Sequence, residues 1–165
     1  MARRIEHLTT YPWTARDVFG ALTSEDHVRD RLAALGGNGA ELISFSGGNG
    51  ETRFELKQGV SAEHLPPVAR NVLGGDLVIQ RTETWRADDL AGAVEVTLGG
   101  VPGRLDGSSR LADTGERASA MTLSGQVRVS IPLVGGKVEG LIVEQVVELL
   151  DAEARFTSEW LARRA

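Results

Sequence analysis

The chain has 165 residues, with 18 basic and 23 acidic side chains and a formal net charge of −5 at pH 7. This length fits one domain over residues 1–165 that buries roughly two-thirds of its unfolded surface. The acidic balance argues against a protein that holds nucleic acid or an anionic lipid surface by charge. Because the sequence has no cysteine, it excludes disulfides, Cys-ligated zinc, iron–sulfur clusters and thiol nucleophiles.

The N-terminal residues do not have the pattern of a secretory signal. Met1 to His7 is basic, but no apolar run follows it. No window approaches the roughly 18 apolar residues of a membrane-spanning helix. We therefore expect a cytoplasmic protein without stable membrane insertion.

The first part of the chain predicts a strand and a pair of short helices. Ile5 to Thr10 is partly alternating and predicts the strand. Thr14 and Ser24 are suitable N-caps for the two helices, and Gly36 is a suitable stop for the second.

From residue 40 onward the hydrophobic pattern has a period of two, which predicts strands. Short turns rich in glycine and aspartate separate most of them, so we expect an antiparallel meander, with a hairpin turn at Gly47 to Gly50. Gly59 to Gly75 interrupts the strands and is interpreted as a flap or a short helix. The six candidate strands are Ala40 to Phe45, Thr52 to Gln58, Asp76 to Arg86, Ala93 to Leu98, Arg104 to Ala112 and Ala118 to Ser130.

The last part of the chain predicts one long amphipathic helix from Val138 to Leu161. Two adjacent rows of apolar side chains make its apolar flank broader than the seam of a coiled coil. We therefore expect the helix to lie across the sheet. One of the two rows consists of Val138, Ile142, Val146, Leu149, Ala152, Phe156 and Trp160.

This order of elements is that of the helix-grip fold, and the sequence resembles the START-like superfamily, also described as the polyketide cyclase and lipid-transport group. More narrowly, it is similar to an uncharacterised bacterial family of unknown function within that group. The segments that carry the resemblance are Pro12 to Leu22, Gln80 to Arg86 and Ser124 to Glu148.

The resemblance implies an α+β fold in which a seven-stranded curved antiparallel sheet surrounds a long C-terminal helix, with two short helices after the first strand. Relatives in the superfamily generally hold an apolar ligand between sheet and helix, and some are cyclases, hydratases or chaperone activators. No motif for any of these activities can be transferred residue by residue. The resemblance therefore implies a fold and a cavity rather than a reaction.

Arg81 and Glu83 are the polar residues of greatest interest, because strand parity places them on the same face as Ile79 and Trp85. Charges facing the interior are costly unless they are paired or reached by water or a ligand. One interpretation is a pair of groups that orient a ligand. The alternatives are a structural ion pair near the cavity mouth, or a bulge that turns both side chains outward.

Strand and helix parity also predict which side chains would line a cavity. A filled core would use the same residue types, so only the resemblance favours a cavity. The predicted ligand-binding residues are Phe54, Leu56, Ile79, Arg81, Glu83, Trp85, Val96, Leu98, Met121, Leu123, Val127, Ile142, Val146 and Leu149.

The sequence predicts no metal site, no cofactor and no catalytic residue. His7, His27 and His64 are scattered, without the spacing of a metal site. No serine lies in a G-x-S-x-G motif, and the glycines from Gly47 to Gly50 do not precede a helix.

Three hypotheses remain open for the function. The first is a non-enzymatic carrier or sensor that encloses a hydrophobic small molecule, such as a lipid or a polyketide-like metabolite. The second is a cyclase-type enzyme that uses the same cavity, with Glu83 as its leading acid or base. The third is a protein-interaction module with a filled core. The sequence does not determine the ligand or the oligomeric state.

Overall fold

The structure, a computed structural model, describes residues 2–60, 63, 67, 70–71, 74 and 76–165. The flap interpreted from Gly59 to Gly75 lies largely outside the described residues. In chain order, the elements are β1 (Ala2–Tyr11), α1 (Ala15–Leu22), α2 (Glu25–Leu35), β2 (Glu41–Gly48), β3 (Glu51–Val60), β4 (Leu77–Arg86), β5 (Ala91–Leu98), β6 (Gly103–Gly115), β7 (Ala118–Val129) and α4 (Gly135–Arg164).

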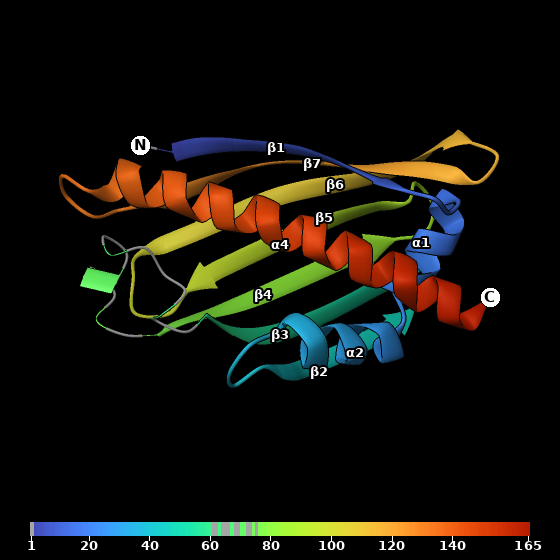
Figure 1. Cartoon of the computed structure of the whole chain (residues 1–165), viewed down its shortest axis with the longest axis horizontal. Helices are drawn as coiled ribbons and strands as arrows, with labels where there is room; N and C mark the ends of the chain where they lie inside the picture. The colour runs from blue at the N-terminus through green and yellow to red at the C-terminus, as the bar shows by residue number, and fades with distance from the viewer. Residues whose placement is uncertain (1, 61–62, 64–66, 68–69, 72–73, 75) are drawn as a thin grey trace.

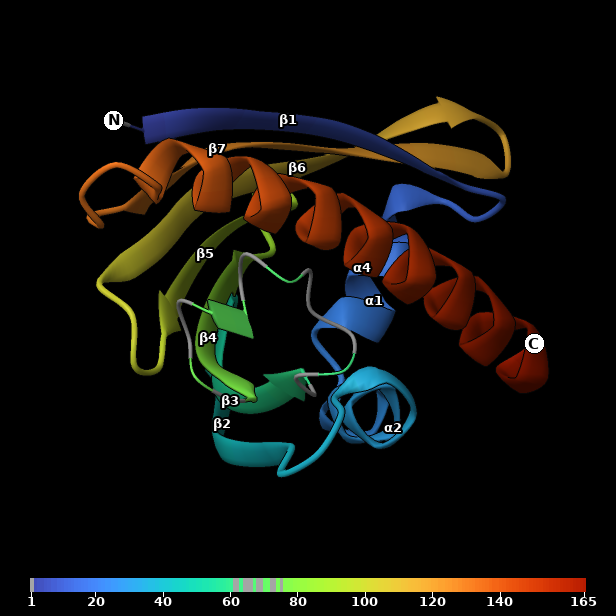
Figure 2. The same ribbon diagram turned by 60° about the vertical axis from the view of Figure 1, so that its left-hand side comes forward.

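The strands form one seven-stranded sheet in the order β1-β7-β6-β5-β4-β3-β2, and every neighbouring pair is antiparallel. The helix α4 runs diagonally across one face of this sheet (Figure 1). A second view shows the sheet curving, so that β2 and α2 lie on the far side from β1 (Figure 2). This arrangement confirms the predicted helix-grip fold class.

The two short helices begin where capping chemistry predicts. The Thr14 hydroxyl accepts a hydrogen bond from the Asp17 amide at 3.1 Å, and the Ser24 hydroxyl accepts one from the His27 amide at 3.5 Å. These bonds satisfy amide groups that have no partner within the first turn of a helix. The Thr14 and Ser24 predictions are therefore confirmed.

The first hairpin corrects one prediction. Its turn comprises Asn49 and Gly50, with φ of 55° and 77°, while Gly47 and Gly48 continue β2. A two-residue turn with positive φ at both positions matches the right-handed twist of the strands, and an Asn-Gly pair adopts it readily. The predicted hairpin is therefore confirmed, but its turn has two residues and is shorter than the stretch predicted from Gly47 to Gly50.

Two hydrophobic clusters make up the core. One joins α1 and α2 to the sheet and includes Val18, Val28, Phe54, Leu56 and Leu111. The other joins the start of α4 to β6 and β7 and includes Leu105, Val127, Val129 and Val138.

Among the described residues, no helix is long and apolar enough to cross a membrane.

Close backbone contact joins the end of α2 to β3. The Gly59 amide donates to the Gly36 carbonyl at 2.9 Å. A Cβ at Gly37 would lie 2.0 Å from the Gly59 carbonyl oxygen, and one at Gly59 would lie 2.1 Å from the Asn38 carbonyl oxygen. Only glycine allows the backbone after α2 to come this close to β3, so the end of α2 lies directly against the sheet.

We expect Gly37→Ala to destabilise the protein more than Gly39→Ala. Both glycines have φ of +74°, so each alanine carries the roughly 1–2 kcal/mol cost of a left-handed conformation. At Gly39 the space around an added Cβ is open, whereas at Gly37 the Cβ meets backbone, which adds roughly 1–3 kcal/mol. Urea unfolding of both variants measures the difference; equal losses of stability would contradict the close contact.

Candidate functional site: the space between sheet and helix

Two neighbouring pockets lie between α4 and the inner face of the sheet. The larger, which we call the apolar pocket, has a volume of about 320 Å³. The smaller, the polar pocket, has a volume of about 90 Å³. Strands β4, β5 and β6 and helix α4 supply the side chains that line both: Ile79, Val96, Leu105, Val146 and Leu149. The two pockets are therefore adjoining parts of one interior space.

Aliphatic side chains from β4 to β7 and from α4 form most of the wall of the apolar pocket. The end of α2 and the end of β3 complete it with Leu35, Gln58 and Val60. Three of its polar residues, Arg104, Gln145 and Glu148, are exposed to solvent. Gln58 differs from these, because it is only 4% exposed.

A buried cluster of four charges lines the polar pocket. It comprises Arg31 from α2, Arg81 and Glu83 from β4, and Glu153 from α4, each at most 8% exposed. Arg81 donates to both carboxylate oxygens of Glu153, at 2.8 and 3.1 Å. Arg31 donates to Oε2 of Glu83 at 3.3 Å. We call these four residues the charge cluster.

Further contacts complete the pairing of the charge cluster. Nε of Arg81 lies 2.9 Å from Oε2 of Glu83, although its N–H is not aligned for a hydrogen bond. The indole Nε1 of Trp85 donates to the other oxygen of Glu83 at 3.0 Å. Two guanidinium groups thus face two carboxylates, which is the condition under which buried charges are tolerated.

The charge cluster also affects the ionisation of its members and neighbours. Burial by itself would raise the pKa of Glu153, but the guanidinium groups of Arg81 and Arg31 hold that pKa below its ordinary value of 4.5. Tyr11 lines the same pocket, and burial, with the nearby Glu153 carboxylate, raises the pKa of its phenol. The interior therefore holds an ionised Glu153 and a protonated Tyr11 at neutral pH.

Most of the predicted ligand-binding residues lie on these two pockets. Those on the apolar pocket are Ile79, Val96, Leu98, Val127, Ile142, Val146 and Leu149. The polar pocket adds Arg81, Glu83, Trp85, Met121 and Leu123.

Both β3 and β5 pair with β4 without a register shift, so Arg81 and Glu83 lie on the inner face of the sheet. The alternative of a bulge that turns both side chains outward is therefore wrong. Ligand binding by these residues stays a prediction.

Phe54 and Leu56 are the two predicted ligand-binding residues that border neither pocket, and their role in binding stays a prediction. Both are fully buried and face inward, but neither is among the residues that line the two pockets. The first half of β3 is covered by the helical pair, and the Phe54 ring stacks on Phe45 with centroids 5.8 Å apart. These side chains pack in the hydrophobic core at that end of the sheet.

Sequence reasoning missed Arg31, Glu153 and Gln58, although each had a signal. Arg31 falls on the apolar face that Val28 and Leu32 define on α2. Helical spacing likewise places Glu153 on the face of α4 that lines the pockets, and Gln58 follows the inward parity of Phe54 and Leu56. In all three cases a polar residue occupied an apolar position.

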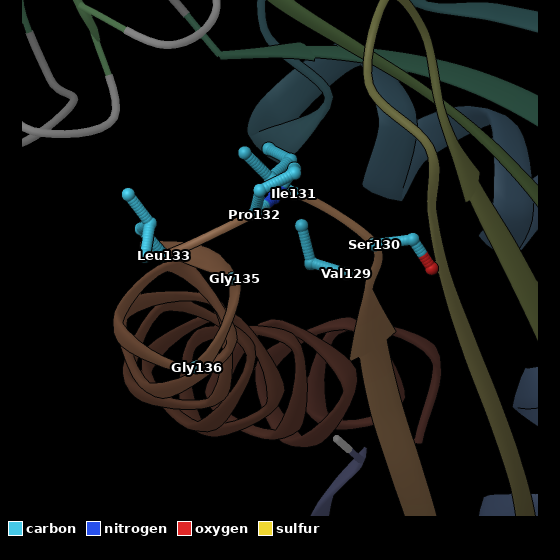
Figure 3. A pocket seen from close by; sticks show the side chains of 7 residues that line it. All are labelled: Val129, Ser130, Ile131, Pro132, Leu133, Gly135 and Gly136. Atoms are coloured by element: carbon cyan, nitrogen blue, oxygen red, sulfur yellow. The ribbon is translucent and has the colours of Figure 1, made fainter.

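A third depression lies at the connection between β7 and α4, with a volume of about 400 Å³. Figure 3 shows it bordered by Val129, Ser130 and the Ile131-to-Gly136 turn, with the Leu133 side chain pointing away. This depression is open to solvent and is formed by one short segment. It offers much less apolar enclosure than the apolar pocket.

The histidines fall in different parts of the fold. His27 is buried between α2 and α4, where its Nε2 lies 3.0 Å from the Thr157 hydroxyl. His7 lies 2.8 Å from the Asp151 carboxylate, and His64 is outside the described residues. Within the described part of the chain, no group of three His, Cys, Asp or Glu residues is placed to hold a metal ion.

We expect Glu153→Gln to cost about 3–5 kcal/mol of stability, because it leaves Arg81 buried without its main carboxylate. The folded-state pKa of Glu153 is depressed, so its stabilising effect is present above the ordinary pKa of 4.5 and is lost as the pH falls through the folded value. Urea unfolding as a function of pH measures both effects. Glu159→Gln, at an exposed position of α4, is the control and should change neither.

A second pH effect should come from His27. Burial, followed by the charge of Arg31, lowers its pKa to about 3 from the ordinary 6.5. The unfolded chain therefore binds a proton that the folded protein does not, and stability falls as the pH drops below 6.5. We expect His27→Gln to remove a slope of up to about 1.4 kcal/mol per pH unit. An unchanged slope of unfolding free energy between pH 6.5 and 4.5 would contradict this assignment.

Comparison with known proteins places the chain in a sequence family and among known folds. An uncharacterized protein of Mycobacterium bovis is 30% identical over 170 residues, covering 98% of each chain. The aromatase/cyclase ZhuI from Streptomyces sp. R1128 matches the structure with a TM-score of 0.63 at 14% identity, covering 99% of this chain and 96% of that one.

A START superfamily protein from Mycobacterium smegmatis matches with a TM-score of 0.57 at 10% identity, covering 98% of this chain and 99% of that one. At these low identities the structural matches show a shared fold, which is the START-like helix-grip fold. Residues 6–161 match the family described as protein of unknown function (DUF2505). The chain therefore belongs to the DUF2505 family.

Proposed function

We propose that this protein binds a hydrophobic small molecule in the apolar pocket between the sheet and α4. The observation that carries the proposal is a pocket of about 320 Å³, partly open to solvent, with a mainly aliphatic wall. This volume lies near the lower end of the roughly 300–1,000 Å³ typical of small-molecule pockets. Burial of apolar ligand surface would supply the binding free energy, at about 25 cal/mol per Å².

The hydrophobic core supports the proposal, because the second cluster itself supplies part of the wall of the apolar pocket, including Leu105, Val127 and Val138. The first cluster packs around α1 and α2 beside the polar pocket. An interaction module with a completely filled core would show no such space. The match to an aromatase/cyclase adds only that the same fold occurs in a protein of that name.

The charge cluster favours a carrier or sensor over an enzyme that uses Glu83 as its acid or base. One Glu83 oxygen accepts a hydrogen bond from Trp85, and the other accepts one from Arg31 and lies beside Arg81. A carboxylate that is held by three protein groups is positioned for a structural role. Arg81 and Glu83 accordingly shape the polar end of the site, and the apolar pocket provides the binding surface.

We expect Val146→Trp to weaken binding of a neutral apolar fluorophore, N-phenylnaphthylamine, by at least about tenfold, because Val146 lines both pockets and an indole would fill the space. Fluorescence titration measures the affinity. Glu144→Trp, at an exposed position of α4 outside both pockets, is the matched control and should bind as the wild type does.

Native mass spectrometry provides a second readout, because a co-purifying ligand would add mass to the folded wild type and not to Val146→Trp. Circular dichroism establishes that the variant is folded. Equal fluorophore binding by the wild type and a folded Val146→Trp would contradict the proposal.

A further inference from the structure

We infer that the Tyr11 hydroxyl is a hydrogen-bonding subsite for the ligand, and that the ligand carries an uncharged acceptor, such as a ketone carbonyl, that receives this bond in the polar pocket. The inference rests on the proposed function and specifies the polar group of the ligand and its orientation. Two observations lead to it: a buried hydroxyl that no described residue uses, and the balance of charge around the polar pocket.

Tyr11 reaches the polar pocket from β1, at the edge of the sheet. The residues of β1 with the same parity, Ile5 and Thr9, are buried as Tyr11 is, so all three face inward. The Tyr11 side chain belongs to the same hydrophobic cluster as Met121, which also lines the polar pocket. Packing therefore holds the Tyr11 ring in place beside that pocket.

The Tyr11 hydroxyl has no hydrogen-bond partner among the described residues, although the residue is only 4% exposed. Ser119, which lies opposite Tyr11 in the pairing of β1 with β7, also has an unpaired hydroxyl, but that oxygen is closed to solvent. The Tyr11 oxygen is not among these closed atoms, so it keeps surface that another molecule can touch. Because Tyr11 borders the polar pocket, we place this surface there.

The polar pocket has room for a small functional group. Ser109 has the inward parity of the buried Leu105 and Leu111 on β6, yet it is partly exposed, because no side chain fills the space that it borders. The volume of about 90 Å³ exceeds the roughly 30 Å³ that one water occupies, so a carbonyl fits. Val146 and Leu149 line both pockets, so the apolar body of the same ligand would lie in the apolar pocket.

The charges around the polar pocket favour a neutral acceptor. Its described lining includes two cations and two anions, which pair with one another: Arg31, Arg81, Glu83 and Glu153. Burial raises the pKa of the Tyr11 phenol and the Glu153 carboxylate raises it further, so the phenol keeps its proton at neutral pH and can donate it. A ligand carboxylate at this place would lose its hydration and meet the same negative charge.

A hydrogen bond at this position should contribute measurably to affinity. A buried donor without an acceptor is unfavourable, so a ligand acceptor that reaches the Tyr11 hydroxyl relieves that cost as well as forming a bond. A carbonyl oxygen accepts strongly, carries no net charge and has no proton of its own to place. The ligand would therefore enter with its carbonyl end towards the charge cluster.

The test uses three probes with the same octyl chain and different head groups. They are methyl octyl ketone, the alkene in which a methylene group replaces its carbonyl oxygen, and nonanoate at neutral pH. Each probe competes with bound N-phenylnaphthylamine in the wild type, in Tyr11→Phe and in Ser119→Ala. Ser119→Ala is the matched control, because it removes a neighbouring unpaired hydroxyl that borders neither pocket.

We expect Tyr11→Phe to weaken binding of the ketone about tenfold and to leave binding of the alkene unchanged, because phenylalanine keeps the ring and loses only the donor. Ser119→Ala should change neither affinity, and the wild type should bind the ketone more tightly than nonanoate. The urea midpoint of unliganded Tyr11→Phe should not fall, since the hydroxyl has no partner in the described part of the chain.

An unchanged affinity of Tyr11→Phe for the ketone, or an equal loss for ketone and alkene, would overturn the inference and leave the proposed function standing. A wild-type preference for nonanoate would also overturn it, and so would a clear fall in the urea midpoint, which would assign the hydroxyl to the fold.

Should Tyr11→Phe not fold, the infrared spectrum of isotope-labelled ketone bound to the wild type decides. A hydrogen bond lowers the carbonyl stretching frequency below its value in hexane, and an unshifted band would overturn the inference. Failure of both the fluorophore and the alkene to bind the wild type would overturn the proposed function and the inference with it.

Discussion

The architecture depends on the buried charge cluster, which ties three elements that are far apart in the sequence. Arg31 comes from α2, Arg81 and Glu83 from the middle of β4, and Glu153 from α4, and their contacts cross from sheet to both helices. Buried ion pairs add little net stability compared with apolar packing. They do constrain how the elements are placed relative to one another, because a misplaced partner leaves a buried charge uncompensated. The charge cluster therefore fixes the position and orientation of α4 on the sheet.

The position of α4 also determines the space beside the charge cluster. Side chains of α4 from Val138 to Leu149 border the apolar pocket, while α1, α2 and the first half of β3 fill the rest of the interior. Since α4 is held by polar contacts at one end and by the Val138 cluster at the other, the wall between them does not have to close. A hollow can persist in a protein whose ends are well packed.

The fold could be predicted from the sequence to a large extent, because hydrophobic period, capping residues and turn residues act locally. The period of two through β3 and β4 correctly placed Arg81 and Glu83 on the inner face. Their partners could not be predicted in the same way, because contact between Arg81 and Glu153 depends on how a helix crosses the sheet, which no local pattern encodes. Phe54 had the same parity as the pocket residues, and only the position of the helical pair shows that its surroundings are filled.

Different turns of α4 serve different purposes. The turns up to Leu149 border the apolar pocket, whereas Glu153, Thr157 and Trp160 attach the helix through Arg81, His27 and Asp30. The start of α4 both borders the apolar pocket and attaches the helix, through the packing of Val138 and the hydrogen bond from the Val129 amide to Glu139, whereas the turns after Leu150 are chiefly attachment. Replacing Ile142, Val146 or Leu149 would therefore change the shape of the apolar pocket while the contacts of Glu153, Thr157 and Trp160 stay in place.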